Sequence, residues 1–181
     1  MNKLQEKMVK EVRPAMMKEF SYRNPMEVPA IEKVSVNIGL SKGVGDKEFI
    51  EQVSKDLKMI TGQSPAPTKA RKSIAGFKIR AGQIIGLKVT LRGQKMWDFI
   101  YRLIGVALPR IKDFQGIKVT NFDQKGNLSI GVKEHLIFPE ISTDDLKKMF
   151  GFQINITLTN CDNQEEGISL FRMLGFPIKK D

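Results

Sequence analysis

Residues 82–93 read GQIIGLKVTLRG, and the alternation within this stretch decides the fold class. Every second residue from Ile85 to Leu91 is large and apolar, whereas the residues between them are small, basic or hydroxylated. Successive side chains of a β-strand point to opposite faces, so this period of two predicts a strand with one buried and one polar face. The residues on the polar face are Gly86, Lys88, Thr90 and Arg92.

Two further stretches, AIEKVSVNIGL at 30–40 and FQINITLTN at 152–160, alternate in the same way. Their polar positions are Lys33, Ser35 and Asn37 in the first stretch and Gln153, Asn155, Thr157 and Thr159 in the second. If the three strands belong to one sheet, a whole sheet face is rich in hydroxyl, amide and basic groups. Such a face suits the phosphates and riboses of a folded RNA. An ordinary solvated sheet face remains the alternative interpretation.

Helical periodicity accounts for much of the remaining chain. The expected helices cover residues 3–20, 46–60, 94–108 and 163–174. Asp46 is placed to cap the second of these helices and Gly62 to end it. Pro14 is expected to kink or break the first helix, and Pro109 to stop the third.

Shorter elements are expected between these helices. They are an edge strand at 68–73, strands at 117–122 and 127–133 around the turn DQKG, and a short helix in STDDLKKMF at 142–150. Strands and helices follow one another without strict alternation. The expectation is therefore an α+β fold, a single domain over residues 1–181, with helices on one face of a largely antiparallel sheet.

The charge of the chain is strongly basic and unevenly distributed. The net charge is +10 and the isoelectric point is near 9.7, which indicates a polyanionic partner such as RNA or an anionic membrane surface. Residues 57–97 contain no Asp or Glu but nine Lys or Arg residues, so the rest of the chain is nearly balanced. A chance gap in acidic residues is the alternative to a selected anion-binding surface.

The most basic part of that region reads QSPAPTKARKSIAGFKIRAG at 63–82. Two prolines keep its start extended, and residues 73–82 are expected to form a basic loop. Five cations in this segment can pair with phosphates, namely Lys69, Arg71, Lys72, Lys78 and Arg80. Gly76 and Gly82 permit close approach of the backbone to a partner.

Residues that could support catalysis are sparse. His135 is the only histidine and Cys161 the only cysteine, so a Cys/His zinc site is excluded and no metal or cofactor is expected. The turn GLSKGVGD at 39–46 follows a strand and opens a helix, but it lacks both phosphate-loop patterns. An enzyme acting on RNA or nucleotides through this turn, and a membrane-surface protein, are the two alternatives kept open. No signal segment or apolar run of membrane-spanning length is found, so a cytosolic protein is expected.

The chain also resembles a known family over nearly its whole length. LKMITGQSPAPTKARKSIAGFKIR at 57–80, followed by GLKVTLRG and MWDF, resembles the signature region of the bacterial form of large-subunit ribosomal protein five. VPAIEKVSVNIG, VALPRIKDFQGI, GNLSIGVKEHLIFPEI and DNQEEGISLFRMLGFP match in the same order. Ser64 is a departure, because family members often carry lysine there.

The resemblance implies a structural, non-enzymatic protein that binds 5S rRNA in the central protuberance, beside 23S rRNA and other large-subunit proteins. The family's 5S contacts fall on Asn37, Gln63 and Thr90 of this chain. Together with the cations of the polar faces and the basic segment, the candidate rRNA-binding set adds Lys33, Lys69, Arg71, Lys88 and Arg92.

The resemblance also implies two contacts outside 5S rRNA. The family's basic loop reaches the elbow of P-site tRNA, and its candidate residues here are Lys72, Ser73, Ile74, Ala75, Gly76, Phe77, Lys78, Ile79 and Arg80. The family forms an intersubunit bridge with a small-subunit head protein, which is expected around residues 109–115 and 141–148. A cytoplasmic, ribosome-bound location follows from the resemblance.

Overall fold

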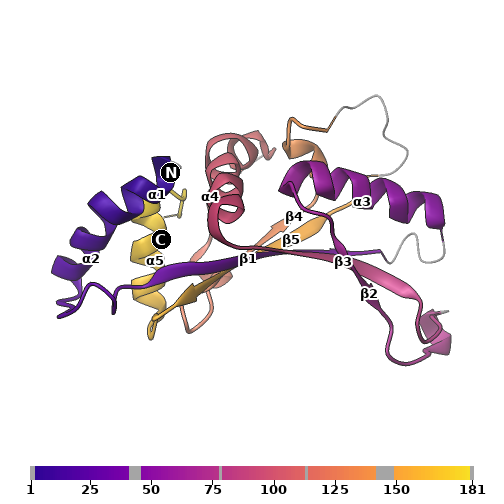
Figure 1. Ribbon diagram of the computed structural model, residues 1–181, viewed down its shortest axis with the longest axis horizontal. Coiled ribbons are helices and arrows are strands. Elements are labelled where there is room, and N and C mark those ends of the chain that lie inside the picture. The colour runs from indigo at the N-terminus through magenta and orange to yellow at the C-terminus, as the bar shows by residue number, and fades with distance from the viewer. Residues whose placement is uncertain (1–2, 41–45, 78, 113, 142–148, 180–181) are drawn as a thin grey trace. The chain divides into compact units, whose positions relative to one another are not determined.

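A computed structural model describes residues 3–40, 46–77, 79–112, 114–141 and 149–179. Five strands form one antiparallel sheet in the order β2-β3-β1-β5-β4 (Figure 1). The strands are β1 (Ala30–Gly39), β2 (Ala66–Lys69), β3 (Ile84–Leu91), β4 (Leu128–Val132) and β5 (Phe152–Thr159). The helices are α1 (Lys3–Lys7), α2 (Arg13–Glu19), α3 (Lys47–Thr61), α4 (Gly93–Arg102) and α5 (Gln164–Leu174). The expected α+β class and antiparallel sheet are confirmed.

The described residues form two compact units. Unit 1 comprises Met1–Val34, Arg92–Ile130 and Asn155–Asp181, and unit 2 comprises Ser35–Leu91 and Gly131–Ile154. Boundaries between them fall inside β1, β4 and β5, so each of these strands contributes residues to both units. The expectation of a single domain over residues 1–181 stays a prediction.

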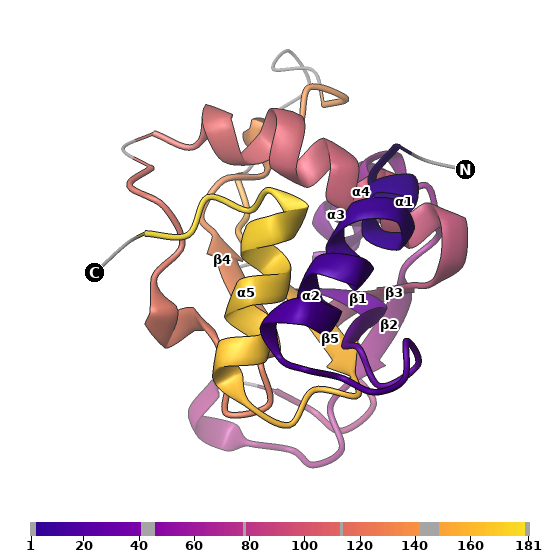
Figure 2. The same cartoon turned by 90° about the vertical axis from the view of Figure 1, so that its left-hand side faces the viewer.

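In unit 1, the expected N-terminal helix runs from Lys3 to Glu19, with a π-helical segment (Met8–Val12) between α1 and α2. Arg13 N donates to Met8 O across this wider turn, and Pro14 stands directly after it, where the missing N–H leaves the α-helical ladder incomplete. The irregularity expected at Pro14 is thus a local widening of a continuous helix. The buried stripe of this helix contacts α5, which lies beside it (Figure 2).

The second helix of unit 1 follows the same pattern of regular and irregular turns. α4 continues as a π-helical segment (Leu103–Ala107) and then as one 3-10 turn (Leu108–Arg110) that contains Pro109. The predicted helix at 94–108 is therefore confirmed, and the helical path extends slightly past the expected stop.

The prediction of a strand at 117–122, in unit 1, is wrong. Residues 117–122 contain a 3-10 turn (Val119–Asn121) flanked by single bridges, from Ile117 to Ile178 and from Phe122 to Leu128. Ile117 N donates to Pro177 O, and Lys179 N donates to Ile117 O. The start of this segment pairs with the C-terminal segment instead of forming a hairpin with β4.

In unit 2, α3 begins and ends as the sequence predicts. Asp46 Oδ1 accepts a hydrogen bond from Phe49 N at 3.2 Å, and Gly62 ends the helix with a φ of 67°. The buried stripe consists of Phe49, Val53, Leu57 and Ile60, while Ile50 is half-buried. Figure 1 shows α3 lying along one side of the sheet, and it contacts β3. The polar positions of β3 therefore remain on the other side.

The edge strand β2 pairs antiparallel with β3, with Pro67 opposite Leu87. The predicted strand at 68–73 is at the sheet edge as expected, but it starts earlier and ends at Lys69. An edge strand tolerates Pro67 because one side of it needs no ladder hydrogen bonds. Most of the turn GLSKGVGD, at 41–45, and of the expected helix in STDDLKKMF, at 142–148, lies outside the described residues.

Candidate nucleic-acid interface

The polar face of β1 and β3 forms the centre of the candidate interface in unit 2. Asn37 and Lys88 are exposed and Thr90 is half-buried, whereas their apolar neighbours along each strand are buried. β1 and β3 are adjacent, and Leu40 N donates to Ile85 O at 2.9 Å, so the end of β1 lies beside the start of β3. The strands therefore present hydroxyl, amide and basic groups side by side on the face that α3 does not cover.

Gln63 is attached to this face from the end of α3. Its Nε2 donates a hydrogen bond to the carbonyl oxygen of Thr90 at 3.2 Å. The hydroxyl of Thr61 donates to Leu57 O at 2.7 Å and also lies 3.0 Å from Gln63 O. The left-handed conformation of Gly62 then turns the chain so that Gln63 leaves the helix toward β3. Two of the three residues implied as 5S contacts are thus joined directly.

Three exposed cations, Lys69, Arg71 and Lys72, follow along β2 and the residues after it. In the described parts of the chain, no carboxylate forms an ion pair with any of them. Cations without an internal partner keep their full attraction for phosphates.

The basic loop at 73–82, here called the finger, is closed like a hairpin. Ala70 N donates to Gln83 O at 2.8 Å and Gly82 N to Ala70 O at 2.9 Å, which closes its base. Further hydrogen bonds fix its sides: Ile74 N to Ile79 O at 2.9 Å, Ala81 N to Ser73 Oγ at 2.9 Å and Arg80 N to Gln83 Oε1 at 3.0 Å. A 3-10 turn (Ala75–Phe77), which includes Gly76, forms its tip, and Lys78 lies outside the described residues.

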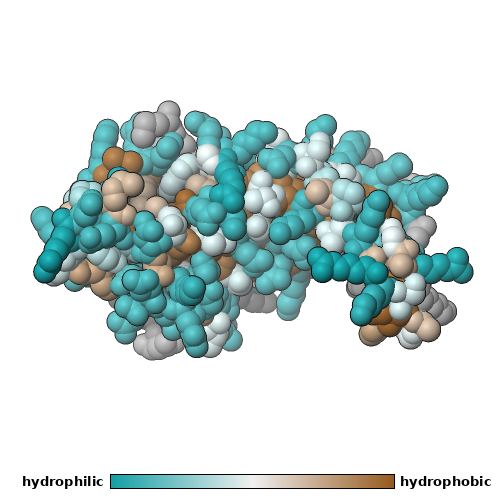
Figure 3. All heavy atoms as spheres, turned by 60° about the horizontal axis from the view of Figure 1, so that its bottom comes forward, coloured by the Kyte–Doolittle hydropathy of each residue, from teal (hydrophilic) through white to brown (hydrophobic). Residues whose placement is uncertain are grey.

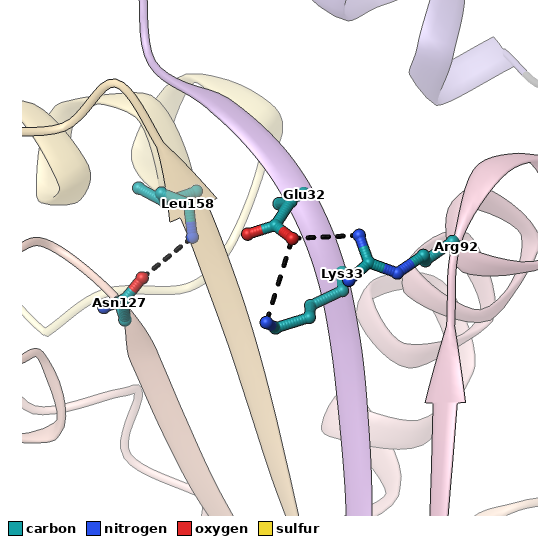
Figure 4. A network of polar contacts seen from close by, with 5 residues as sticks. All are labelled: Glu32, Lys33, Arg92, Asn127 and Leu158. Carbon is teal, nitrogen blue, oxygen red and sulfur yellow. Dashed lines mark hydrogen bonds and ion pairs between the residues drawn. The ribbon is translucent and has the colours of Figure 1, made fainter.

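The two remaining candidate cations, Lys33 and Arg92, lie in unit 1 and share an acidic partner (Figure 4). Glu32 Oε1 accepts a hydrogen bond from Arg92 Nη1 at 2.9 Å and lies 3.8 Å from Lys33 Nζ. The hydrogen bond from Arg92, aided by the charge of Lys33, lowers the pKa of Glu32 below its ordinary value. Both cations are therefore partly neutralised in the RNA-free protein, unlike those of β2.

Sequence reasoning missed Glu32 because strict alternation assigns it to the buried side of β1. In the structure Glu32 and Lys33 are both half-buried, so the period of two is interrupted at this point. It also missed the shaping role of Gln83 and the degree to which Phe77, an apolar residue, is exposed, which is 74%. The only sequence signal for the role of Gln83 was its position directly after the loop.

The two residues considered for catalysis are structural. His135 is fully buried and stacked on Phe150 with ring centroids 3.9 Å apart, and its Nδ1 lies 3.3 Å from Phe150 O. Burial raises the pKa of the Cys161 thiol to about 11, so the reactive thiolate is disfavoured.

Two further features are absent from the residues that the structure describes. Within those ranges, no group of three or more His, Cys, Asp or Glu side chains is arranged to hold a metal ion. No helix in the described ranges has the length and apolar character needed to cross a membrane.

Comparison with known proteins relates both units to one family. The family model described as Ribosomal protein L5 matches residues 24–80, and the model of the C-terminus of the same ribosomal family matches residues 84–178. The chain is 52% identical over 180 residues to the large ribosomal subunit protein uL5 of Dictyoglomus turgidum. It is 48% identical over 180 residues to the protein of the same name from Shewanella piezotolerans. Each alignment covers 99% of this chain and 100% of the relative.

Proposed function

The chain belongs to the ribosomal protein L5 family and is a structural, non-enzymatic constituent of the large ribosomal subunit. On this basis we propose that its polar sheet face binds 5S rRNA. The residues assigned to this contact are Asn37, Gln63 and Thr90, with Lys69, Arg71 and Lys88 pairing with phosphates nearby. In unit 1, Lys33 and Arg92 are further candidate phosphate contacts, for which RNA competes with Glu32.

One observation carries this proposal, namely the hydrogen bond from Gln63 Nε2 to Thr90 O. It holds a side-chain amide beside the polar face of β3, where acidic residues are absent from 57–97. The remaining donor and acceptor of that amide suit riboses and phosphates, which a protein reads through shape and backbone rather than base edges. The polar strand positions carry no aromatic residues, so this face is not one that stacks single-stranded bases.

Filter binding to 5S rRNA tests this assignment at a fixed salt concentration. The variant with Asn37, Gln63 and Thr90 all changed to Ala should bind much more weakly, while its urea unfolding shows that the fold persists. A matched control changes Thr120, Gln124 and Ser129, which are exposed polar residues of unit 1, to Ala. Equal affinity of the two triple variants would overturn the assignment.

The finger, together with Lys72 directly before it, is the proposed contact with P-site tRNA, through residues 72–80. Arg80 in the finger and Lys72 directly before it are exposed, and the base and sides of the finger are closed by its own hydrogen bonds. Deleting residues 73–82 should leave 5S binding largely intact and shorten the retention of P-site tRNA. Loss of 5S binding on deletion would contradict this division of roles.

Further partners follow from the same family assignment. We assign the intersubunit bridge, made with a small-subunit head protein, to the surface around residues 109–115 and 141–148. Of this surface the structure describes residues 109–112, 114–115 and 141, and among these Pro109, Arg110, Lys112 and Gln115 are exposed. Neighbouring 23S rRNA and large-subunit proteins complete the proposed environment of a ribosome-bound, cytoplasmic protein.

A further inference from the structure

Phosphate binding does not explain the exposure of Phe77, which at 74% is the most exposed large hydrophobic side chain among the described residues. Burial of such a side chain stabilises a fold, and the isolated chain forgoes that gain. Ile74, at the start of the same tip, is also half exposed at 49%. Figure 3 shows hydrophobic surface at the tip of the protruding segment, bordered by hydrophilic side chains.

The position of Phe77 is fixed by the backbone and is not a by-product of an irregular loop. Phe77 N donates to Ile74 O at 3.3 Å, and Ile74 pairs with Ile79 through two backbone hydrogen bonds of 2.9 and 3.2 Å. These bonds set the turn on which the ring stands, so little ordering remains to be done when a partner binds.

The surroundings of the ring indicate the kind of partner. Arg71, Lys72 and Arg80 are exposed in the same segment, and no acidic residue occurs within 57–97. An apolar protein pocket would accept the ring but would have to desolvate or neutralise these cations. RNA meets both requirements, since a base offers a π-face to the ring while phosphates pair with the cations.

We propose that Phe77 stacks on a nucleobase that the folded RNA at the finger leaves unpaired, and that this contact gives the finger its preference for an exposed base. The inference rests on the proposed contact of the finger with P-site tRNA and adds to it a specific aromatic contact. The cations would then supply sequence-independent attraction, and the ring would select the site.

The test uses ribosomes assembled with the full-length chain and measures the dissociation rate of deacylated tRNA from the P site. Phe77→Ala and Phe77→Leu should speed dissociation about 5- to 150-fold, because stacking of one base is worth on the order of 1–3 kcal/mol. Phe77→Trp should retain tRNA to the same extent as the original protein does, since indole also stacks. The salt dependence should not change in any of the three, because no charge is removed.

A second arm identifies the base. tRNAs that carry one abasic nucleotide at each unpaired elbow position are bound to ribosomes with either Phe77 or Phe77→Ala. At the stacked position, removal of the base should weaken binding with Phe77 and cause no further loss with Phe77→Ala. If no position abolishes the effect of Phe77→Ala, the stacking proposal is wrong.

The other outcomes separate this inference from the proposed function. If Phe77→Leu holds tRNA normally, only apolar bulk is used and stacking is excluded. If Phe77→Ala has no effect while deletion of the finger does, the tRNA contact stands without stacking. If the deletion also has no effect, both proposals fail. If Phe77→Ala instead weakens retention of a neighbouring ribosomal protein, the ring binds protein and the RNA proposal is overturned.

Discussion

Gln63 Nε2 donates a hydrogen bond to the carbonyl oxygen of Thr90 at 3.2 Å, which connects the residue after the end of α3 to the end of β3. The bond sets the position of the amide, because it fixes Nε2 while the backbone of Gln63 is fixed by Thr61. It therefore links the stability of the α3 terminus to the geometry of the candidate RNA-binding face.

Gln63→Glu should test that link with little change in side-chain shape. A carboxylate cannot donate to Thr90 O, and it brings negative charge to a face proposed to meet phosphates. The affinity for 5S rRNA should fall about tenfold or more, since a lost hydrogen bond and a repulsive charge each cost on the order of 1 kcal/mol. Gln124→Glu makes the same charge change at an exposed turn in unit 1, and equal affinities of the two variants in filter binding would contradict the prediction.

Glu32→Gln should strengthen RNA binding, because it frees Arg92 and Lys33 from their shared carboxylate. Each freed cation that then meets a phosphate releases about one counterion. The slope of log affinity against log salt should therefore steepen by roughly one to two. The measurement is a salt titration of 5S binding with Glu11→Gln as the matched charge control, because Glu11 is exposed in unit 1 outside the candidate set. An unchanged slope would show that Arg92 and Lys33 do not reach the RNA.

The sequence predicted the regular parts of both units because the information there is local. Alternation identified β1, β3 and β5, and an acidic cap with a terminal glycine identified α3. The same alternation assigned Asn37 and Thr90 to the polar face, where the structure also has them partly or fully exposed.

The parts that could not be predicted depend on residues far apart in the chain. Ile117 pairs with Ile178, so the short strand expected at 117–122 does not form. Arg92 reaches Glu32 from 60 residues away, so the neutralisation of Arg92 and Lys33 could not be read from either strand alone. The outward position of Phe77 depends on the closed backbone of the finger, and its apolar character suggested burial instead.

Gly86→Ala should destabilise the protein because β1 approaches β3 closely at this position. A Cβ at Gly86 would lie 2.8 Å from Ile38 O, a backbone atom that cannot move without shifting the strand. The expected loss in the free energy of unfolding is roughly 1–3 kcal/mol, as for other overpacked sites. Gly131→Ala in β4 is the control, since nothing lies within 4 Å of its added Cβ. Urea unfolding measures the stability of both variants. Equal stabilities would show that the strands accommodate the added Cβ at position 86 without loss in the free energy of unfolding.

His135 should make the stability of the protein depend on pH near neutrality. Burial lowers its pKa below the ordinary value of 6.5, and the opposing influences of Phe150 O, Asp56 and Glu134 do not outweigh that effect. The unfolded chain therefore binds a proton at a higher pH than the folded chain does. The free energy of unfolding should be greatest above pH 6.5 and should decrease as the pH falls toward the lowered pKa of the folded state.

His135→Phe removes this titration and keeps an aromatic ring against Phe150. The variant loses the polar contact of Nδ1 and should be less stable at pH 7.5, but its stability should change less than that of the original protein between pH 7.5 and 5.5. Urea unfolding at a series of pH values measures the two slopes. Because His135 is the only histidine in the chain, NMR of its ring protons follows the folded-state titration without ambiguity. Parallel slopes, or a folded-state midpoint at or above pH 6.5, would show that burial does not control this residue.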